Sequence, residues 1–213
     1  MTDVWSGRAD AYRESEAHRE GKDLDLVVEW AAGLQTALDV ATGGGHVARR
    51  LRAAGLEVVS SDPAPGMQPD VICRAEDLPF ANGSFDLVVT RVAPHHFEDV
   101  PGAVAEMAGV ARALVIVVDN LHVSETADQA DRIRDPSHGR NYTEDEWRSF
   151  FAGAGLEVED VRTIERAILL GPWLARAGCA GEDAARVREL LAARIDGERL
   201  TLPRIALKGR VKA

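Results

Sequence analysis

The apolar positions of this 213-residue chain follow two spacings in turn. Short apolar runs, which predict buried strands, occur at residues 36–41, 56–62, 85–90 and 114–118. Between these runs, apolar residues recur at the spacing of an amphipathic helix, most clearly at residues 21–34, 47–55 and 100–110. The alternation predicts strand–helix–strand units, in which parallel strands are joined by crossover helices.

The C-terminal part of the chain is less regular. Residues 121–141 have no strand pattern, and we expect a helix at 123–133 that ends before Pro136. Thr143 and Glu146 form a capping box at the start of a further helix. The remaining predicted elements are a strand at 156–168, helical segments at 172–174 and 181–195, and a last strand at 200–211.

The first predicted strand runs directly into the turn Gly43-Gly44-Gly45. Glycine lets the chain bend sharply and lets a ligand approach the backbone. The helix that follows places free N–H groups and the positive end of its dipole at the same edge. Residues 43–48 also satisfy the G-x-G-x-x-A form of the dinucleotide fingerprint. An NAD-dependent oxidoreductase is therefore one alternative, although no Tyr-x-x-x-Lys pair or comparable hydride-site signature accompanies the turn.

Two aspartates flank this turn. Asp39 precedes the turn, and Asp62 ends the second strand. The number of residues between the two aspartates suits a strand–helix–strand unit. A carboxylate at the end of that strand can accept two hydrogen bonds from a ribose diol. The alternative is an aspartate that only initiates the turn before Pro63. The preceding glycine turn favours the ribose role.

The segment between Asp62 and Ala75 contains three prolines and is too short for another crossover helix. We therefore expect an extended loop there, followed by a short edge strand at residues 70–73. One wall of any nucleotide pocket at this place should consequently be thin, with Met67 as a candidate apolar contact.

In the order in which they occur, these features resemble class I S-adenosylmethionine-dependent methyltransferases, in particular the small ubiquinone/menaquinone C-methyltransferase-like branch. The segments that carry the resemblance are Asp39 with the glycine turn, Asp62, Ala75-Glu76-Asp77-Leu78-Pro79-Phe80 and Phe85-Asp86-Leu87-Val88-Val89-Thr90. Further similarity extends from Tyr12 through the "RDPSH…NYT" segment at 134–143 to Trp173. The resemblance covers most of the chain and is specific for fold and cofactor, but not for substrate.

The resemblance implies an α/β fold with a doubly wound, seven-stranded, mostly parallel Rossmann-like sheet, an antiparallel last strand, a helical N-terminal arm and a cap. It implies one domain, 1–213, divided into an arm (1–34), a cofactor-binding half (35–120), a cap insertion (121–142) and C-terminal helices with an edge hairpin (143–213). We expect two helices in the arm, with a break near Gly21. In the family, the arm lies over the cofactor and substrate cleft.

The implied cofactor is S-adenosylmethionine, with S-adenosylhomocysteine as the product. The residues predicted to bind it are Asp39, Ala41, Gly43, Gly45, Asp62, Ala75, Glu76 and Arg91. Arg74 departs from the family pattern, because many members place there an aspartate that receives the adenine amino group, and arginine has no acceptor. The backbone of Ala75 and the side chains of Glu76 or Asp77 remain as adenine contacts. A methyltransferase-fold protein with altered or lost cofactor binding, acting as a binding or regulatory module, is the second alternative.

Polar residues beyond the strand at 85–90 are candidates for the methyl-acceptor site. His95, His96 and His138 are candidate general bases near neutral pH, needed only for a protonated acceptor. The substrate-binding candidates are Tyr12, Arg134 and Tyr142. Each group also has a structural interpretation: a histidine after this strand is common in the family whatever the substrate, and Tyr12 can simply pack the arm onto the sheet.

The composition narrows the range of partners. The formal net charge is −10 and the pI about 5.1, and no Lys/Arg run supplies the basic face of a nucleic-acid-binding protein. The N-terminus does not resemble a signal peptide, and no apolar run approaches the roughly 20 residues of a membrane span. Cys73 and Cys179 lack metal-type spacing. We expect a cytoplasmic monomer or homodimer that acts on a small molecule, with no nucleic acid, membrane or metal.

Overall fold

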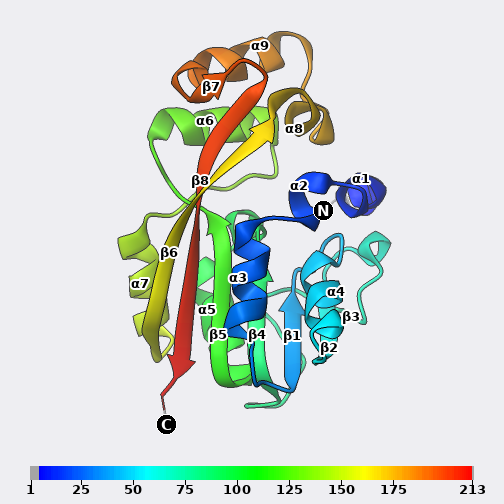
Figure 1. Cartoon of the computed structure of the whole chain (residues 1–213), viewed down its shortest axis with the longest axis vertical. Coiled ribbons are helices and arrows are strands. Elements are labelled where there is room, and N and C mark those ends of the chain that lie inside the picture. Colours follow the sequence, from blue (N-terminus) through cyan, green and yellow to red (C-terminus); the bar gives the residue numbers. More distant parts are fainter. Residues whose placement is uncertain (1–4, 213) are drawn as a thin grey trace.

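The computed structural model describes residues 5–212, except for the side chains of residues 16 and 17. A mixed sheet lies at its centre (Figure 1). Its strands are β1 (Thr36–Val40), β2 (Glu57–Asp62), β3 (Val71–Ile72), β4 (Phe85–Arg91), β5 (Ala111–Asn120), β6 (Leu156–Leu169), β7 (Ile195–Asp196) and β8 (Arg199–Val211). Seven strands follow the order β3-β2-β1-β4-β5-β8-β6, and the two-residue β7 pairs with β8. The predicted α/β sheet with an antiparallel last strand is confirmed, and β7 is an addition to the seven predicted strands.

The strand order reverses at β1, which has β2 on one side and β4 on the other. The three strands are parallel, with Val40 opposite both Ser61 and Thr90. Their carboxyl ends therefore meet at one edge of the sheet. In open α/β sheets, ligands bind in the crevice at this reversal point.

Helices cover both faces of the sheet (Figure 1). Ala37 and Leu87 belong to the apolar cluster on one face, whereas Leu38 and Val88 belong to the cluster on the other, because successive strand residues point to opposite sides. The helices on the first face are α3 (Lys22–Trp30) and α4 (His46–Ala53), and those on the second are α5 (Val100–Val110) and α7 (Glu144–Gly153). Burial on both faces explains why the strand segments read as continuous apolar runs.

Both ends of β5 differ from the prediction. The helix at 100–110 is confirmed as α5, but β5 begins at the next residue, Ala111, without a connecting loop. The strand therefore covers 111–120 rather than 114–118. Pairing with β4 on one side and β8 on the other supplies hydrogen bonds along this greater length.

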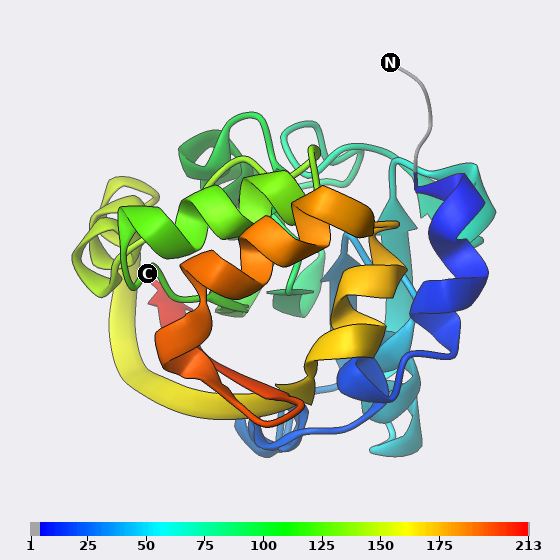
Figure 2. The same cartoon turned by 90° about the horizontal axis from the view of Figure 1, so that it is seen from above.

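The two long antiparallel strands β6 and β8 continue beyond the parallel strands and carry a cap of helices (Figures 1 and 2). The cap helices are α6 (Glu125–Arg134), α8 (Leu170–Arg176) and α9 (Gly181–Leu190). They enclose an apolar cluster that includes Ala130, Trp173 and Leu200. The residues between β6 and β8 thus join the 121–142 segment in the cap. The helix predicted over 181–195 ends at Leu190, because η4 (Ala192–Arg194) and β7 turn the chain back into β8.

Of the two helices predicted before β1, the second is confirmed as α3. The part before α3, called the arm from here on, consists of shorter pieces than the predicted first helix. It comprises η1 (Ser6–Arg8), α1 (Ala9–Arg13) and α2 (Glu16–Arg19), and the expected break before α3 falls at Gly21, where φ is 141°. Helices this short are not stable by themselves, so packing decides their path. Trp5, Ala9 and Tyr12 pack against Ala64 and Met67.

The loop after β2 confirms the prediction for residues 63–73. It contains a single 3-10 turn, η2 (Pro65–Met67), and β3 pairs only two residues with β2. Met67 is buried, whereas Ile72 on the edge strand is 60% exposed.

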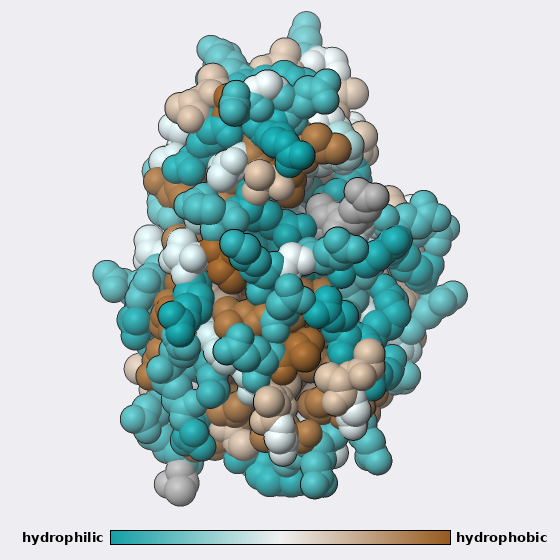
Figure 3. Space-filling model, in the orientation of Figure 1, coloured by the Kyte–Doolittle hydropathy of each residue, from teal (hydrophilic) through white to brown (hydrophobic). Residues whose placement is uncertain are grey.

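The outer surface is largely polar. On the face shown in Figure 3, hydrophilic residues predominate, and the most obvious hydrophobic group lies over α3. Leu169 and Ile72 are the exposed large hydrophobic residues of the described part of the chain. None of the helices built from residues 5–212 has the length and apolar character needed to cross a bilayer.

Candidate active site

A cavity of about 580 Å³, here called the main cavity, opens at the shared edge of β1, β2 and β4. Its walls come from the arm, the glycine turn, the η2 loop, the loop with η3 (Pro94–His96) and the cap loop at 136–137. The predicted site residues in its lining are Tyr12, Asp39, Ala41, Gly43, Asp62, Ala75, Glu76, Arg91 and His96. The volume lies in the range of cofactor and small-molecule sites, about 300–1,000 Å³.

The glycine turn brings bare backbone to this cavity. Gly43 has φ 51°, and a Cβ built there would meet no atom within 4 Å. A Cβ on Gly44 would lie 2.8 Å from the carbonyl oxygen of Tyr12, so the arm crosses the turn at that point. Gly45, with φ 72°, is the N-cap of α4 and shapes the turn without lining the cavity.

Asp39 ties the turn to the start of α4. Its Oδ2 accepts hydrogen bonds from Thr42 Oγ1 at 2.5 Å and from the Ala48 N–H at 3.0 Å. The side chain is buried, and burial raises the pKa of this carboxyl to about 6. A nearby positive charge would favour the ionised form.

Asp62 makes the local turn bond considered from the sequence and also lines the main cavity, where its ribose role stays a prediction. Its Oδ1 accepts from the Ala64 N–H at 2.9 Å, which is the local turn bond of an aspartate before proline. Its Oδ2 accepts from the Gly43 N–H at 2.9 Å and so joins the end of β2 to the glycine turn. The carboxylate therefore stands where the two backbone segments meet the cavity.

Arg91 links the end of β4 to α3. Its Nε donates to Asp23 Oδ2 at 2.8 Å, and its Nη1 donates to the His18 carbonyl at 3.0 Å. Arg204 Nη1 also donates to Asp23 Oδ2, at 2.7 Å. Burial raises the pKa of the Asp23 carboxyl, but these arginines outweigh burial and hold that pKa well below its usual value. Arg91 Nη2 is buried and has no hydrogen-bond partner among the described residues.

The segment 74–76 forms another part of the lining. Arg74 Nη2 lies 2.9 Å from Glu98 Oε2, and Arg74 Nε lies 3.4 Å from Glu76 Oε2. Glu76 Oε1 in turn accepts from the Glu98 N–H at 3.0 Å. The carboxylates closest to Arg74, those of Glu76 and Glu98, thus already form ion pairs with it. The apolar lining near the loops includes Ala64, Met67 and Phe97.

Of the three histidines predicted as bases, His96 lines the main cavity. Its Nδ1 lies 3.0 Å from the carbonyl oxygen of Ser137. Because a carbonyl oxygen only accepts, Nδ1 carries the proton and Nε2 presents a lone pair. Burial lowers the pKa of His96 to about 3, so the ring is neutral at pH 7. The ring of Trp5 packs edge-on against it at 4.6 Å.

His95 turns away from the main cavity towards Asp119. Its Nδ1 lies 2.6 Å from Asp119 Oδ1, and its N–H donates to Asp119 Oδ2 at 2.9 Å. Burial raises the pKa of Asp119 to about 7 and lowers that of His95 to about 3. The buried pair therefore favours an uncharged form that shares one proton.

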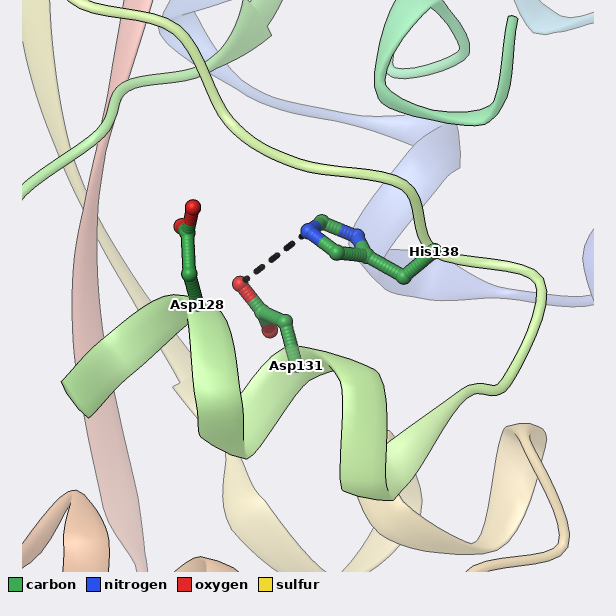
Figure 4. A group of neighbouring side chains, drawn as sticks. All are labelled: Asp128, Asp131 and His138. Atoms are coloured by element: carbon green, nitrogen blue, oxygen red, sulfur yellow. Dashed lines mark ion pairs between the residues drawn. The ribbon is translucent and has the colours of Figure 1, made fainter. Parts of the chain in front are cut away.

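His138 lies beyond His95, with the two ring centroids 4.9 Å apart. Its Nε2 faces Asp131 Oδ2 at 4.0 Å, and Asp128 lies beside them on α6 (Figure 4). The donor atoms of these three residues lie within 4.8 Å of one another, which is a grouping of metal-ligand types. Asn141 Nδ2, however, donates to both carboxylates at 3.0 and 2.9 Å and so already joins them. His138 lines neither of the two cavities described here.

The two remaining substrate-binding candidates lie in different places. Tyr142 packs against Trp147 and Phe150, with ring centroids 5.6 and 5.3 Å away, and lines neither cavity. Its position thus gives the predicted substrate contact no support. Arg134 lines a second, smaller cavity together with Tyr12.

Among the residues of the main cavity that were not candidates from the sequence are His46 and Trp5. His46 Nε2 lies 2.9 Å from the Tyr12 carbonyl oxygen and fixes the arm over the glycine turn. Its position directly after three glycines at a helix start is the signal that would have found it. Trp5 lines the cavity from the arm, and nothing in the hydrophobic pattern marks that role.

Comparisons with known proteins agree with this architecture. Residues 38–118 match the family described as "Methyltransferase domain". The Bacillus subtilis protein YcgJ, an uncharacterized methyltransferase, is 29% identical, over 82% of this chain and 78% of its own. The Escherichia coli protein YafE, itself uncharacterized, is 31% identical, over 61% of this chain and 68% of its own. The chain belongs to the class I S-adenosylmethionine-dependent methyltransferases.

The crystal structure of YcgJ shares the methyltransferase fold. It superposes with a TM-score of 0.82 at 24% identity and covers 90% of this chain and 98% of that chain. The segment that matches the methyltransferase family runs from β1 to β5 and contains the glycine turn, Asp62 and Arg91. The arm and the cap lie outside it.

Proposed function

We propose that this methyltransferase transfers a methyl group from S-adenosylmethionine to a small-molecule acceptor. The observation that carries the proposal is the extent of the main cavity, which reaches from Gly43 and Asp62 to Trp5 and His96. Displacement at a methyl group requires the acceptor atom in line with the bond that breaks. One cavity that joins the nucleotide-type turn to a candidate base can hold both molecules in this way.

The residues present suit the cofactor. Gly43 leaves open space where a Cβ would stand, which gives a ligand access to the backbone. Asp62 stands at the strand end where ribose hydroxyls are bound in nucleotide sites. Arg91 offers a buried Nη2 donor without a hydrogen-bond partner among the described residues, which suits a carboxylate. The other predicted cofactor contacts in the lining are Asp39, Ala41, Ala75 and Glu76.

When bound, the cofactor would supply an electrophilic methyl group on a sulfonium, with the neutral thioether as the leaving group. The chain aligns the acceptor and keeps water out. Trp5 and Tyr12 cover the cavity from the arm. Because His96 lines the main cavity and its Nε2 carries a lone pair, it is our candidate to take the proton of a protonated acceptor, whereas an acceptor that is already deprotonated needs no base.

Calorimetric titration with S-adenosylhomocysteine and with NAD tests this function. We expect the wild type to bind S-adenosylhomocysteine and not NAD. Asp62→Ala should weaken binding by about 1–3 kcal/mol, because charge-assisted hydrogen bonds to the ribose are lost. A 2′-deoxy analogue should bind the wild type and the variant almost equally.

Asp25→Ala is the matched control, since Asp25 is an exposed aspartate of α3 outside the cavity lining, and it should leave both affinities unchanged. If Asp62→Ala still discriminated strongly against the deoxy analogue, the ribose contact would lie elsewhere. Binding of NAD in place of S-adenosylhomocysteine would favour the oxidoreductase alternative.

A second candidate function is a binding or regulatory module that has altered or lost cofactor binding. The ion pairs of Arg74 with Glu98 and Glu76 favour it, because they occupy the carboxylates next to the place of the usual adenine acceptor. Absence of S-adenosylhomocysteine binding by the wild type would support this candidate and contradict methyl transfer.

A further inference from the structure

A second cavity, of about 50 Å³, adjoins the main cavity beneath the cap. The two share four wall residues, Tyr12, His18, Val92 and His96. One ligand can therefore extend from the second cavity into the main cavity. The small volume suits a compact group rather than a second whole molecule.

Guanidinium groups dominate the walls of this second cavity. They come from four elements that are distant in the sequence, namely Arg134 at the end of α6, Arg166 on β6, Arg176 at the end of α8 and Arg204 on β8. Neighbouring positive charges inside a protein repel one another, and each is costly to remove from water. Such a concentration therefore calls for negative partners.

Asp23 supplies one such partner. It accepts from Arg204 at 2.7 Å, and its Oδ1 lies 3.6 Å from Arg166 Nη1. Asp23 is also the partner of Arg91, at 2.8 Å. One carboxylate thus faces three arginines.

Arg134 and Arg176 have no carboxylate partner among the described side chains. Arg134 stacks over the ring of Trp173 at 4.3 Å and donates its Nε to the Trp173 carbonyl at 3.3 Å. Arg176 makes no hydrogen bond or ion pair with the described residues, although it is half-buried. Burial lowers the pKa of Arg176, and the charge of Arg134 lowers it further.

The other titratable groups of the lining supply one further negative charge, that of Asp131, which is fewer than the four arginines need. Burial lowers the pKa of His18 and His95, and nearby arginines lower both further, so these rings are neutral. Asp131 also lines the cavity. Burial raises its pKa to about 6, against the lowering effect of Arg134, so it is still mostly ionised at pH 7, but its Oδ2 already accepts from Asn141 at 2.9 Å. The balance of charge around the cavity is therefore positive.

We propose that the second cavity binds a compact anionic group of the methyl acceptor, a carboxylate or a single phosphate, through Arg134 and Arg176. This inference rests on the proposed methyl transfer. The forked guanidinium matches the paired oxygens of either anion. An acceptor held there extends past Tyr12 and His96 into the main cavity, where its reacting atom meets the cofactor. The arginines thus position the substrate and select acidic acceptors over neutral ones.

Titrations with inorganic phosphate and with acetate, at constant ionic strength and with S-adenosylhomocysteine present, test the site. We expect at least one of the two anions to bind the wild type, and Arg176→Gln to weaken that binding at least tenfold. Arg132→Gln is the matched control, since Arg132 is an exposed arginine of the same helix as Arg134 and lines neither cavity. Its anion affinity should equal that of the wild type. The preferred anion distinguishes a phosphorylated from a carboxylic acceptor.

Arg134→Gln provides an independent variant, and melting temperatures show whether each variant is folded. If neither anion binds the wild type, or if Arg176→Gln and Arg132→Gln bind alike, the anion site is wrong. The affinity for S-adenosylhomocysteine should be the same in Arg176→Gln and the wild type. If an anion binds but S-adenosylhomocysteine does not, methyl transfer fails while the anion site stands. If S-adenosylhomocysteine binds but neither anion does, the anion site alone fails.

Discussion

Left-handed backbone angles at residues other than glycine occur at or next to the main cavity. The non-glycine residues with positive φ in the described chain are Ala41, Gln68 and Val92, at 55°, 57° and 56°. Ala41 and Val92 line the cavity, and Gln68 follows Met67, which also lines it. Each such residue costs roughly 1–2 kcal/mol, and strain of this kind concentrates at functional sites. The local backbone therefore supports a binding role for this edge of the sheet independently of the motif.

Gly43→Val should abolish cofactor binding while the fold is retained. The side chain would enter the open space beside the turn, and its left-handed backbone would add strain of roughly 1–2 kcal/mol or more. Gly197→Val is the matched control, since Gly197 has φ 56°, also has open space around its Cβ position and lies outside the cavity lining. Both variants should melt at similarly lowered temperatures, but only Gly43→Val should lose S-adenosylhomocysteine affinity in calorimetry. Unchanged affinity would remove the turn from the site.

Residues marked by a local signal could be predicted, whereas those placed by tertiary contacts could not. Asp39 and Asp62 follow from their positions around a glycine turn. The partner of Arg91, in contrast, is Asp23 on α3, which is far away in the sequence and brought near only by helix packing. Trp5 reaches the cavity in the same way, through the path of the arm.

Whole helices and strands also differ in whether a local sequence signal or a tertiary contact determines them. The capping box of Thr143 and Glu146 is local, and the structure contains both of its hydrogen bonds. The parallel strands were also predictable, because burial on both faces makes them continuous apolar runs. The packing of α6 against α8 and α9 could not be predicted, because it depends on how far β6 and β8 continue past the parallel strands.

The replacement of a crossover helix by η2 should make adenine recognition permissive. The carboxylates beside Arg74 in the cavity lining, Glu76 and Glu98, are already paired with Arg74, and Glu76 also accepts from the Glu98 N–H. Exchanging the adenine amino group for oxygen should therefore leave no buried acceptor unpaired. We expect S-adenosylhomocysteine and its inosine analogue to bind within tenfold of each other, about 1.4 kcal/mol, in calorimetric titrations. A larger preference for adenine would show that another group has become the acceptor. Glu76→Gln would then identify it, since that variant should remove the preference if Glu76 is responsible.

At the scale of the whole molecule, the arm joins the sheet half to the cap. Arg13 donates to the carbonyl of Gly66 in the η2 loop, at 2.5 Å. Arg8 pairs with Asp135 at the end of α6 at 3.1 Å and donates to the Ala177 carbonyl at 3.4 Å. The same arm contributes Tyr12 to both cavities. Ligand exchange and movement of the arm are therefore expected to be coupled.

Arg8→Gln should loosen the arm and speed the release of a bound ligand. Asp135 is almost fully buried, and although burial raises its pKa, hydrogen bonds from Ser137 hold that pKa at about 2. Because the folded pKa lies below the unfolded value of about 3.9, the stabilisation is complete at neutral pH and is lost only as the pH falls towards 2. Loss of the pair at pH 7 should cost about 1 kcal/mol, which is roughly a fivefold change. Stopped-flow release of S-adenosylhomocysteine should quicken accordingly, and hydrogen exchange should rise in the arm, residues 6–19.

Arg50→Gln is the control for this effect. Arg50 also forms an ion pair, with Asp25, but that pair is exposed and joins α4 to α3 without touching the arm or the cap. An exposed pair contributes about 0–1 kcal/mol, so its loss should change neither release nor exchange in the arm. If Arg8→Gln and Arg50→Gln behaved alike, the arm would not govern access to the cavity.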